Sequence, residues 1–354
     1  MLANDLSIAT WPGYDAATVI DLLASVTPFN VPDMYARPLT GEMVENARAS
    51  GITAVNATCS GGGADPFAET VGNIAFWERE FDAHPDVLLK VKTIGDIREA
   101  KKSKRLGVIL GFQDATMFAS DASRVDLCHH LAVRIVQLTY NLRNLLGDGC
   151  LEPANAGLST FGRQVLARLN ELGMLVDLSH VGRQTSLDAI LASKRPVAAT
   201  HTGCAAINDV PRNKPDAILK AIAGRGGVVG MYLMPFLRAQ GQPSAEDFLR
   251  HMNHAVNVCG EDHVGVGSDL SITPLDLTPE FRAKHAAFVR ARRQMGISAP
   301  GEAEDVFNYV PDFNSPRRME RIAEALAKAR YSSSRIEKLI GGNWMRLLGE
   351  VWNG

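Results

Sequence analysis

Short runs of β-branched and other apolar residues alternate with helical stretches along almost the whole chain, and this alternation constrains the fold most. Eight runs have the length and composition of strands: Thr18–Leu23, Ile52–Thr58, Gly107–Phe112, Val133–Thr139, Met174–Leu178, Val197–Thr200, Val228–Tyr232 and Val264–Gly267. Strands that alternate with helices favour a parallel sheet. We therefore expect an α/β fold, a (β/α)8 TIM barrel, with a doubly wound open sheet as the alternative.

The segments between these runs carry helix signals. Phe161–Leu172 repeats apolar residues at helical spacing and stops at Gly173, a residue that favours helix ends. Asp216–Ala223 has Pro215 before it and Gly224 after it, which is the preferred arrangement at helix ends. Further helices are predicted at Thr185–Ser193, Phe248–Val258 and Met319–Ala329.

We predict one barrel domain over residues 1–354, with an accessory segment near 59–100 and a long insertion near 271–315. The accessory segment includes a ninth apolar run, Val87–Val91, which we expect outside the barrel. The insertion follows the last strand, and Thr273–Ser315 contains four prolines and mixed charges. Long loops of this kind are more often functional than idle, so we expect it to lie over the barrel mouth.

The composition excludes several classes of protein. Lysine and arginine total 37 against 39 aspartates and glutamates, a net charge of −2, which predicts binding to neither nucleic acid nor an anionic membrane. No segment approaches the roughly 20 apolar residues of a membrane span, and the first residues lack the pattern of a secretory signal. The five cysteines are widely spaced without a C-x-x-C pair, which favours a reducing compartment. We expect a cytoplasmic protein.

A polar or ligand-type residue follows five of the eight predicted strands. Active sites of such barrels lie where the strands end at their C-terminal face, so these residues are expected to lie near one another. In chain order they are Gln113, Tyr140, His180, His201 and Asp269.

The two histidines follow consecutive strands. Either one alone is more commonly a surface or core side chain. Neighbouring parallel strands lie about 4.8 Å apart, however, so His180 and His201 can reach the same ion. Imidazole ligands suit zinc, copper, iron or nickel better than magnesium or calcium. The pattern therefore predicts a metal site.

Two further residues fit a hydrolytic site. Asp269 ends an apolar strand, where it is either a turn or helix-capping residue or a general base near a metal-bound water. Arg212, in the loop after the sixth strand, is either part of a surface ion pair or the group that binds a substrate carboxylate. No Gly-x-Ser-x-Gly motif is present, which disfavours a serine hydrolase.

Six motifs then point to one family. They are Gly157–Gly162, Leu172–Val181, Thr200–Thr202, Pro211–Asn213, Asp262–Asp269 and Gly341–Arg346. With these motifs in this order, the chain resembles the membrane (renal) dipeptidases, metallopeptidase family M19, from about Val19 to Trp352.

The resemblance implies a (β/α)8 barrel with a binuclear zinc centre that hydrolyses dipeptides, including some with a D- or dehydro-residue on the C-terminal side. It also implies a homodimer. His180 and His201 match the two histidines on one zinc, and Arg212 matches the arginine that binds the substrate carboxylate. Asp269 matches the aspartate after the eighth strand.

Four positions depart from the family pattern. Leu23 and Ser25 stand where its first strand supplies a His-x-Asp pair, and Gln113 replaces the bridging glutamate. Leucine cannot bind zinc, so we expect one zinc ion on His180, His201 and Gln113 or Asp269, rather than two. Tyr140 replaces a histidine that supports the oxyanion, and its hydroxyl can still donate a hydrogen bond there.

Three functions follow from this pattern. The first is a dipeptidase-like amidohydrolase for a small substrate with a free carboxylate, with one zinc, Asp269 as base and Arg212 as carboxylate anchor. The second is a divergent hydrolase or lyase that acts on a modified amino acid. The third is a ligand-binding protein of the same fold without catalysis.

Overall fold

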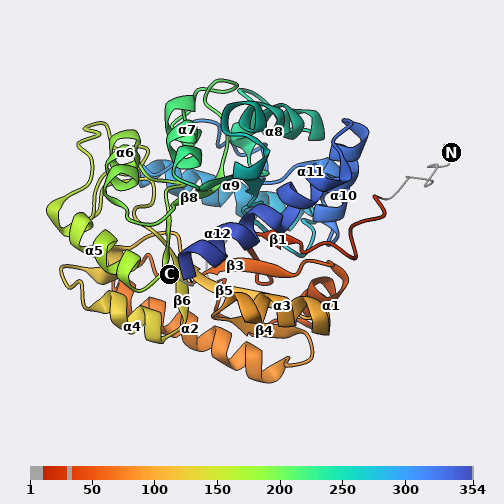
Figure 1. The fold of residues 1–354 in the computed structure, drawn as a ribbon, viewed down its shortest axis with the longest axis horizontal. Helices are drawn as coiled ribbons and strands as arrows, with labels where there is room; N and C mark the ends of the chain where they lie inside the picture. The colour runs from red at the N-terminus through yellow and green to blue at the C-terminus, as the bar shows by residue number, and fades with distance from the viewer. Residues whose placement is uncertain (1–10, 30–33, 353–354) are drawn as a thin grey trace.

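The computed structural model describes residues 11–29 and 34–352 and shows helices packed around parallel strands (Figure 1). Eight strands follow one another around the sheet in the order of the chain. A doubly wound sheet would reverse its order partway, so that alternative is excluded. The strands are β1 (Ile20–Asp21), β3 (Ala54–Thr58), β5 (Leu106–Phe112), β6 (Val133–Gln137), β7 (Leu175–Asp177), β8 (Ala198–Thr202), β9 (Val228–Met231) and β10 (Val264–Val266).

The first and last strands meet through a few hydrogen bonds. The amide of Leu22 donates to the carbonyl of Val266 at 3.1 Å. Farther along, β11 (Leu270–Ser271) pairs in parallel with β2 (Ala24–Ser25). The first predicted strand, Thr18–Leu23, thus corresponds to β1, and β2 begins just after its predicted end. The barrel is nearly closed, and the predicted TIM-type fold is confirmed.

The ninth apolar run forms β4 (Leu88–Val91), which lies off the path of the eight strands. It pairs with the first half of β5, from Leu106 to Ile109, whereas β6 pairs with β5 from Leu110 onward. One long strand therefore has two successive neighbours along the same edge.

The side chains inside the barrel change from apolar to polar along its axis. At the N-terminal ends of the strands, Ile109, Leu175 and Val228 pack with Trp344 and Leu347 in one buried cluster. Trp344 and Leu347 belong to α12 (Asn343–Trp352), which crosses the centre of the view in Figure 1. This helix closes the N-terminal end of the barrel.

Farther up the interior the strands carry polar side chains. Because side chains alternate along a strand, the residues two positions beyond the apolar layer also point inward. They include Asn56, Gln137, Asp177 and Thr200, all buried. The site above therefore rests on a polar layer.

The five predicted helices agree with α5, α6, α7, α8 and α10 to within a few residues. Ser159 caps α5, and its hydroxyl accepts a hydrogen bond from the amide of Gly162 at 2.9 Å. The helices are α1 (Gly41–Ala49), α2 (Pro66–Ala83), α3 (Ile94–Ser103), α4 (Arg124–His130), α5 (Thr160–Glu171), α6 (Arg183–Ala192), α7 (Asp216–Gly224), α8 (Ala245–Cys259), α10 (Arg318–Lys328) and α11 (Ser333–Glu337).

The long insertion after the last strand contains a helix, α9 (Pro279–Gln294). Thr278 caps it by accepting a hydrogen bond from the amide of Phe281 at 3.1 Å. We call residues 279–308, that is α9 and the segment after it, the cap. Its side chains line the same cavity as residues at the C-terminal ends of the strands.

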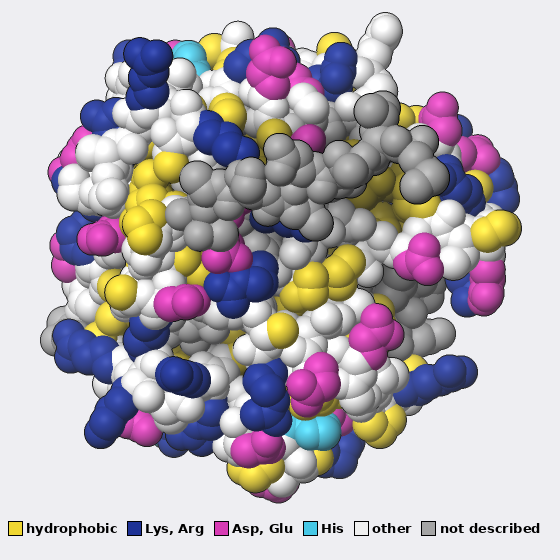
Figure 2. All heavy atoms as spheres, turned by 90° about the vertical axis from the view of Figure 1, so that its right-hand side faces the viewer, with side chains coloured by type: hydrophobic (Ala, Val, Ile, Leu, Met, Phe, Trp, Pro, Cys, Tyr) yellow, Lys and Arg dark blue, Asp and Glu magenta, His cyan; other side chains and the backbone are white. Residues whose placement is uncertain are grey.

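The surface agrees with the balanced composition. On the face in Figure 2, acidic and basic side chains are interspersed, without a large area of one sign. Within the described ranges, no helix is both long and apolar enough to cross a bilayer. All five cysteines are unpaired.

Candidate active site

The two strand-end histidines lie side by side, as predicted. His180 follows β7 and His201 lies within β8; both are buried, and their ring centroids are 5.1 Å apart. The pairing register between β8 and β9 shifts between Ala199 and Thr202. Such an irregularity re-aims the side chains within it, here including His201.

Hydrogen bonds fix the tautomer of His201. The hydroxyl of Thr200 donates to Asp177 at 2.6 Å and lies 2.8 Å from Nδ1 of His201. Because the hydroxyl hydrogen is used by Asp177, Nδ1 of His201 carries the hydrogen in the second bond. Nε2 is then an acceptor, and the amide of Gln113 approaches it at 3.4 Å. Asp177 was not among the predicted site residues.

His180 is held by a different pair of neighbours. Its Nδ1 donates to the side-chain oxygen of Asn141 at 2.7 Å, and the ring of Tyr140 stacks on it at a centroid distance of 4.2 Å. Its Nε2 is buried and has no hydrogen-bond partner among the described residues. Burial lowers the pKa of both His180 and His201 well below the usual range, and the charge of Arg212 lowers them further. Both rings are therefore neutral at neutral pH.

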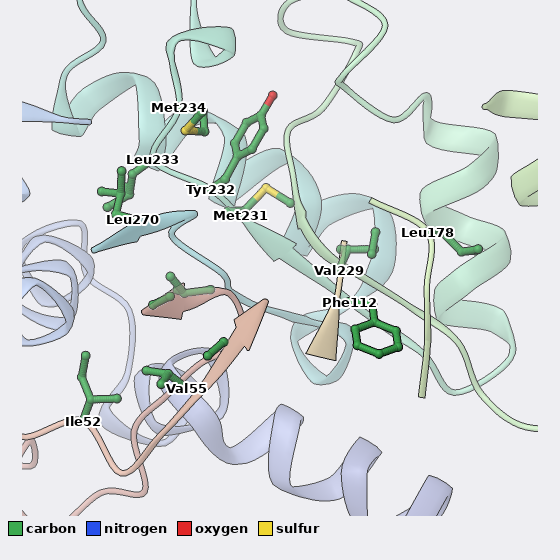
Figure 3. Packing of buried hydrophobic residues seen from close by; sticks show 14 of the residues in the cluster. Ile52, Val55, Phe112, Leu178, Val229, Met231, Tyr232, Leu233, Met234 and Leu270 are labelled. Carbon is green, nitrogen blue, oxygen red and sulfur yellow. The ribbon is translucent and has the colours of Figure 1, made fainter. Parts of the chain in front are cut away.

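Arg212 is a buried cation beside the histidines. Its Nη1 donates to the backbone carbonyl of Ser179 at 2.7 Å, while Nη2 makes no hydrogen bond to any described residue. Its Cζ lies 5.7 Å from the ring of Tyr232 and 6.0 Å from that of Phe236. Figure 3 shows Tyr232 and Met234 on the segment that continues from β9. The guanidinium thus lies near two aromatic rings, and its Nη2 is free to donate hydrogen bonds.

Asp269 lies between β10 and β11 in a left-handed conformation, with φ 64°. Its amide donates to the carbonyl of Leu23 at 2.8 Å, which fixes the turn across the barrel seam. Burial raises the pKa of its carboxyl to about 7, although Arg212 opposes this shift. A carboxyl with such a pKa can take up and release a proton near neutral pH.

The cap completes the cavity above these residues. Arg292 of α9 lies 6.0 Å from the ring of Tyr140, and its guanidinium forms two hydrogen bonds with Glu302, at 2.9 and 3.0 Å. Burial raises the pKa of Tyr140, so its hydroxyl keeps its hydrogen. The cavity is lined by Tyr140, Asn141, His180, Arg212, Met234, Phe236, Asp269, His285, Phe288, Val289, Arg292, Glu302, Ala303, Val306 and Asn308.

These donors fit one metal ion better than two. His180 and His201 each leave Nε2 as an acceptor, and Nε2 of His180 is an orphaned buried atom. Leu23 offers no donor atom, and the hydroxyl of Ser25 lies 2.7 Å from that of Thr27. In residues 11–29 and 34–352, no three His, Cys, Asp or Glu side chains come together as a ligand set. Within these ranges, positions 23 and 25 thus do not supply the His-x-Asp ligands of a second metal ion.

Comparison with known proteins adds to this geometry. The family model for membrane dipeptidases, peptidase family M19, matches residues 39–278. The chain belongs to this family. It is a dipeptidase-family hydrolase of the M19 type, and the resemblance seen in the motifs is confirmed.

Among solved structures, an amidohydrolase from Pseudomonas aeruginosa is 31% identical to this M19 chain, with a TM-score of 0.81. The match covers 96% of this chain and 98% of that one. A metallopeptidase from Rhodobacter sphaeroides, bound to a phosphinate mimic of the dipeptide L-Ala-D-Ala, is 17% identical with a TM-score of 0.76. Its match covers 95% of this chain and 99% of that one, and at this identity the likeness shows the fold.

Two curated relatives carry the name dipeptidase. Dipeptidase verJ of Clonostachys rogersoniana is 31% identical over 193 residues, which is 53% of this chain and 49% of that protein. Dipeptidase aclJ of Aspergillus oryzae is 28% identical over 291 residues, 80% of this chain and 61% of that protein. The M19 chain thus spans less than two thirds of either relative.

The structure brings together all six predicted site residues, although their roles remain predictions. His180, Arg212, Asp269 and Tyr140 line one cavity, the ring of His201 lies beside that of His180, and Gln113 approaches His201. Sequence reasoning did not assign roles to Asn141 or to Arg292 of the cap. Asn141 follows Tyr140 at a strand end and could have been found there, whereas nothing marked Arg292.

Proposed function

We propose that this M19 protein hydrolyses an amide bond in a dipeptide or a similar small molecule with a free carboxylate, and that it uses at most one zinc ion. The observation that carries the proposal is Arg212: a buried guanidinium with a free Nη2 in the cavity of His180 and Asp269. A carboxylate is the group that best satisfies such a donor.

The residues support a division of roles. Arg212 binds the substrate carboxylate and so holds the scissile amide near Asp269. Asp269 accepts a proton from the attacking water, for which its pKa of about 7 is suited. The hydroxyl of Tyr140 donates a hydrogen bond to the oxyanion that develops on the carbonyl, and the cap limits the access of water.

His180 and His201 would hold the zinc ion through Nε2. A bound zinc lowers the pKa of its water to about 7 and polarises a carbonyl. Gln113 would need to turn its amide oxygen toward the ion to act as a third ligand, because its nitrogen faces His201 in this structure.

The substituted ligand positions favour a second candidate, a hydrolase or lyase for a modified amino acid. Leu23 and Gln113 differ from the family pattern, whereas Arg212 and Asp269 match it. Such a pattern is expected if the protein still binds a substrate carboxylate through Arg212 but catalyses a different reaction.

The test combines metal analysis with kinetics. We expect about one zinc ion or less per chain, turnover of simple dipeptides, and loss of turnover in His180→Ala. His130→Ala, an exposed histidine on α4, is the matched control and should keep wild-type activity. Full activity of the metal-free protein would contradict the zinc assignment, and activity only toward acylated or methylated amino acids would favour the second candidate. Thermal stabilisation by ligands without turnover would favour a binding protein.

The same proposal includes a cytoplasmic homodimer. Five unpaired cysteines are compatible with a reducing compartment. Light scattering of the purified protein gives its mass in solution, and cell fractionation gives its location.

A further inference from the structure

The cap lies outside the part of the chain that the family model matches. That match ends at residue 278, and α9 begins at Pro279. The cap nevertheless supplies about half of the residues that line the cavity. The cap can therefore give this chain a substrate selectivity of its own within the family.

The cap contributes apolar side chains to the cavity that Arg212 also lines. Phe288, Val289 and Val306 line the cavity from the cap, and Met234 and Phe236 line it from the barrel side. Phe236 is also within 6.0 Å of the Arg212 guanidinium. These five side chains are the apolar contacts that the cavity offers to a substituent next to a bound carboxylate; of the polar residues in the cap, His285 is already bonded to the carbonyls of Ala303 and Val306.

The charged groups of the cap do not offer a second anchor. Glu302 occupies Nε and Nη2 of Arg292 with both of its carboxylate oxygens, and the two side chains are only 11% and 10% exposed. Glu302 also accepts hydrogen bonds from Ser298 and Ala299. This ion pair is internally neutralised, whereas Nη2 of Arg212 has no partner among the described residues. Among the described residues, Nη2 of Arg212 is therefore the donor in this cavity that a substrate carboxylate can use.

We propose that the cap makes this site selective for substrates with an apolar side chain next to the carboxylate that Arg212 binds. The inference rests on the proposed amidohydrolase function and deepens it. A charged side chain in the same place would lose its hydration without gaining a counter-ion from these apolar side chains, which is costly. A leucine or phenylalanine side chain would exchange water for apolar contacts.

The test compares dipeptides that share the scissile bond and differ only in the C-terminal side chain. Glycyl-leucine and glycyl-phenylalanine should give kcat/KM values at least about tenfold above those of glycyl-aspartate and glycyl-lysine. Equal values, or a preference for either charged substrate, would overturn the inference. The lysine substrate is included because Asp269 also lines the cavity.

Two variants on α9 test whether the cap causes the selectivity for apolar side chains. Val289→Thr keeps the volume but adds a hydroxyl to the cavity lining, and it should reduce the apolar-to-charged ratio several-fold. Ala287→Ser adds the same group on the exposed face of the helix and should leave the ratio unchanged. Thermal unfolding of both variants shows whether the cap remains folded. A ratio that is unchanged in a folded Val289→Thr would place the selectivity elsewhere and contradict the role of the cap.

A binding measurement separates this inference from the proposed function. If no dipeptide is cleaved, the proposed function fails. Thermal stabilisation by 4-methylpentanoate, an apolar acid, can then be compared with that by succinate, which has a second carboxylate. Stronger stabilisation by 4-methylpentanoate would support the apolar site on its own, and equal or weaker stabilisation would overturn it.

Discussion

Arg212 is the residue whose substitution tests substrate binding most directly. Arg212→Lys keeps the charge but loses the planar fork that can make two parallel hydrogen bonds to a carboxylate. We expect kcat/KM to fall roughly ten- to hundredfold, as for the loss of one charge-assisted hydrogen bond. Arg183→Lys, at an exposed arginine of α6, is the control and should have little effect. An unchanged KM in Arg212→Lys would exclude a carboxylate contact.

The raised pKa of Asp269 leads to a prediction of how activity depends on pH. Burial raises the pKa of its carboxyl to about 7, and a general base must be deprotonated. We therefore expect kcat/KM to fall as the pH is lowered through about 7. A pH profile of kcat/KM on the wild-type protein checks this, and a rate that stays constant down to pH 5 would exclude Asp269 as the base.

The same shift has a consequence for stability. In the unfolded chain an aspartate ionises near pH 4, so the folded chain binds the proton more tightly between about pH 4 and 7. Stability from this group is therefore lost as the pH rises through that window. Asp269→Asn should raise Tm relative to wild type at pH 8 and change it little at pH 4. Asp276→Asn, at an exposed carboxyl, should change Tm at neither pH.

Gln113 offers a way to strengthen the proposed zinc site. Gln113→Glu places a carboxylate beside Nε2 of His201, where an amide lies now. Because carboxylates bind zinc more strongly than neutral amides, zinc content after dialysis should rise. Gln164→Glu makes the same change on the exposed face of α5 and should leave zinc content as it is. Equal zinc in both variants would show that position 113 does not face the ion.

Which site residues were predictable follows from where they lie. His180, His201 and Asp269 were found because strand ends converge in a barrel, and strand ends can be read from apolar runs. Asp177 was missed because it lies inside an apolar strand and acts by holding Thr200, a contact between two strands. Arg292 was missed because its approach to Tyr140 depends on how a distant segment folds back.

The cap is an element that depends on one buried ion pair. Glu302→Gln leaves Arg292 without its counter-ion, and such losses cost about 3–5 kcal/mol for buried pairs. We expect faster hydrogen exchange and proteolysis within residues 279–308. Glu304→Gln removes a more exposed partner, that of Arg290, and should cost about 1 kcal/mol or less. Equal protection in both variants would mean that the pair does not hold the cap.

Sequence patterns predicted the eight strands of the barrel and five of its helices, whereas α1, α2, α3, α4, α11 and α12 were not predicted. The short strands β2 and β11, which pair with each other across the seam, were not predicted. The helix α9 was predicted only as part of a long insertion. Its two buried positions are His285 and Val289, and one of them is polar.

At the scale of the whole molecule, stability depends on α12, which closes the N-terminal end of the barrel and which we call the plug. Trp344 is fully buried, donates a hydrogen bond to Val266 at 3.0 Å, and lies so close to Gly265 that an added Cβ would be 2.5 Å from its ring. Trp344→Ala should lower the free energy of unfolding by about 3–5 kcal/mol. Denaturant unfolding measures this change.

Trp344→Phe restores most of the volume and serves as the comparison, with a smaller loss. Because the plug and the site lie at opposite ends of the barrel, the folded fraction of either variant should keep its kcat at low temperature. A large loss of kcat in a fully folded Trp344→Phe protein would show that the two ends are coupled.

The position of the cap in the chain has a practical consequence. It is one uninterrupted stretch between β11 and α10, and its contacts with the site come from side chains rather than from strand pairing. Such a stretch can be exchanged as a cassette between relatives without altering the strands that carry the histidines. Grafts of this kind would allow the accepted side chain to be reprogrammed separately from the reaction, and natural variation in this stretch would do the same during evolution.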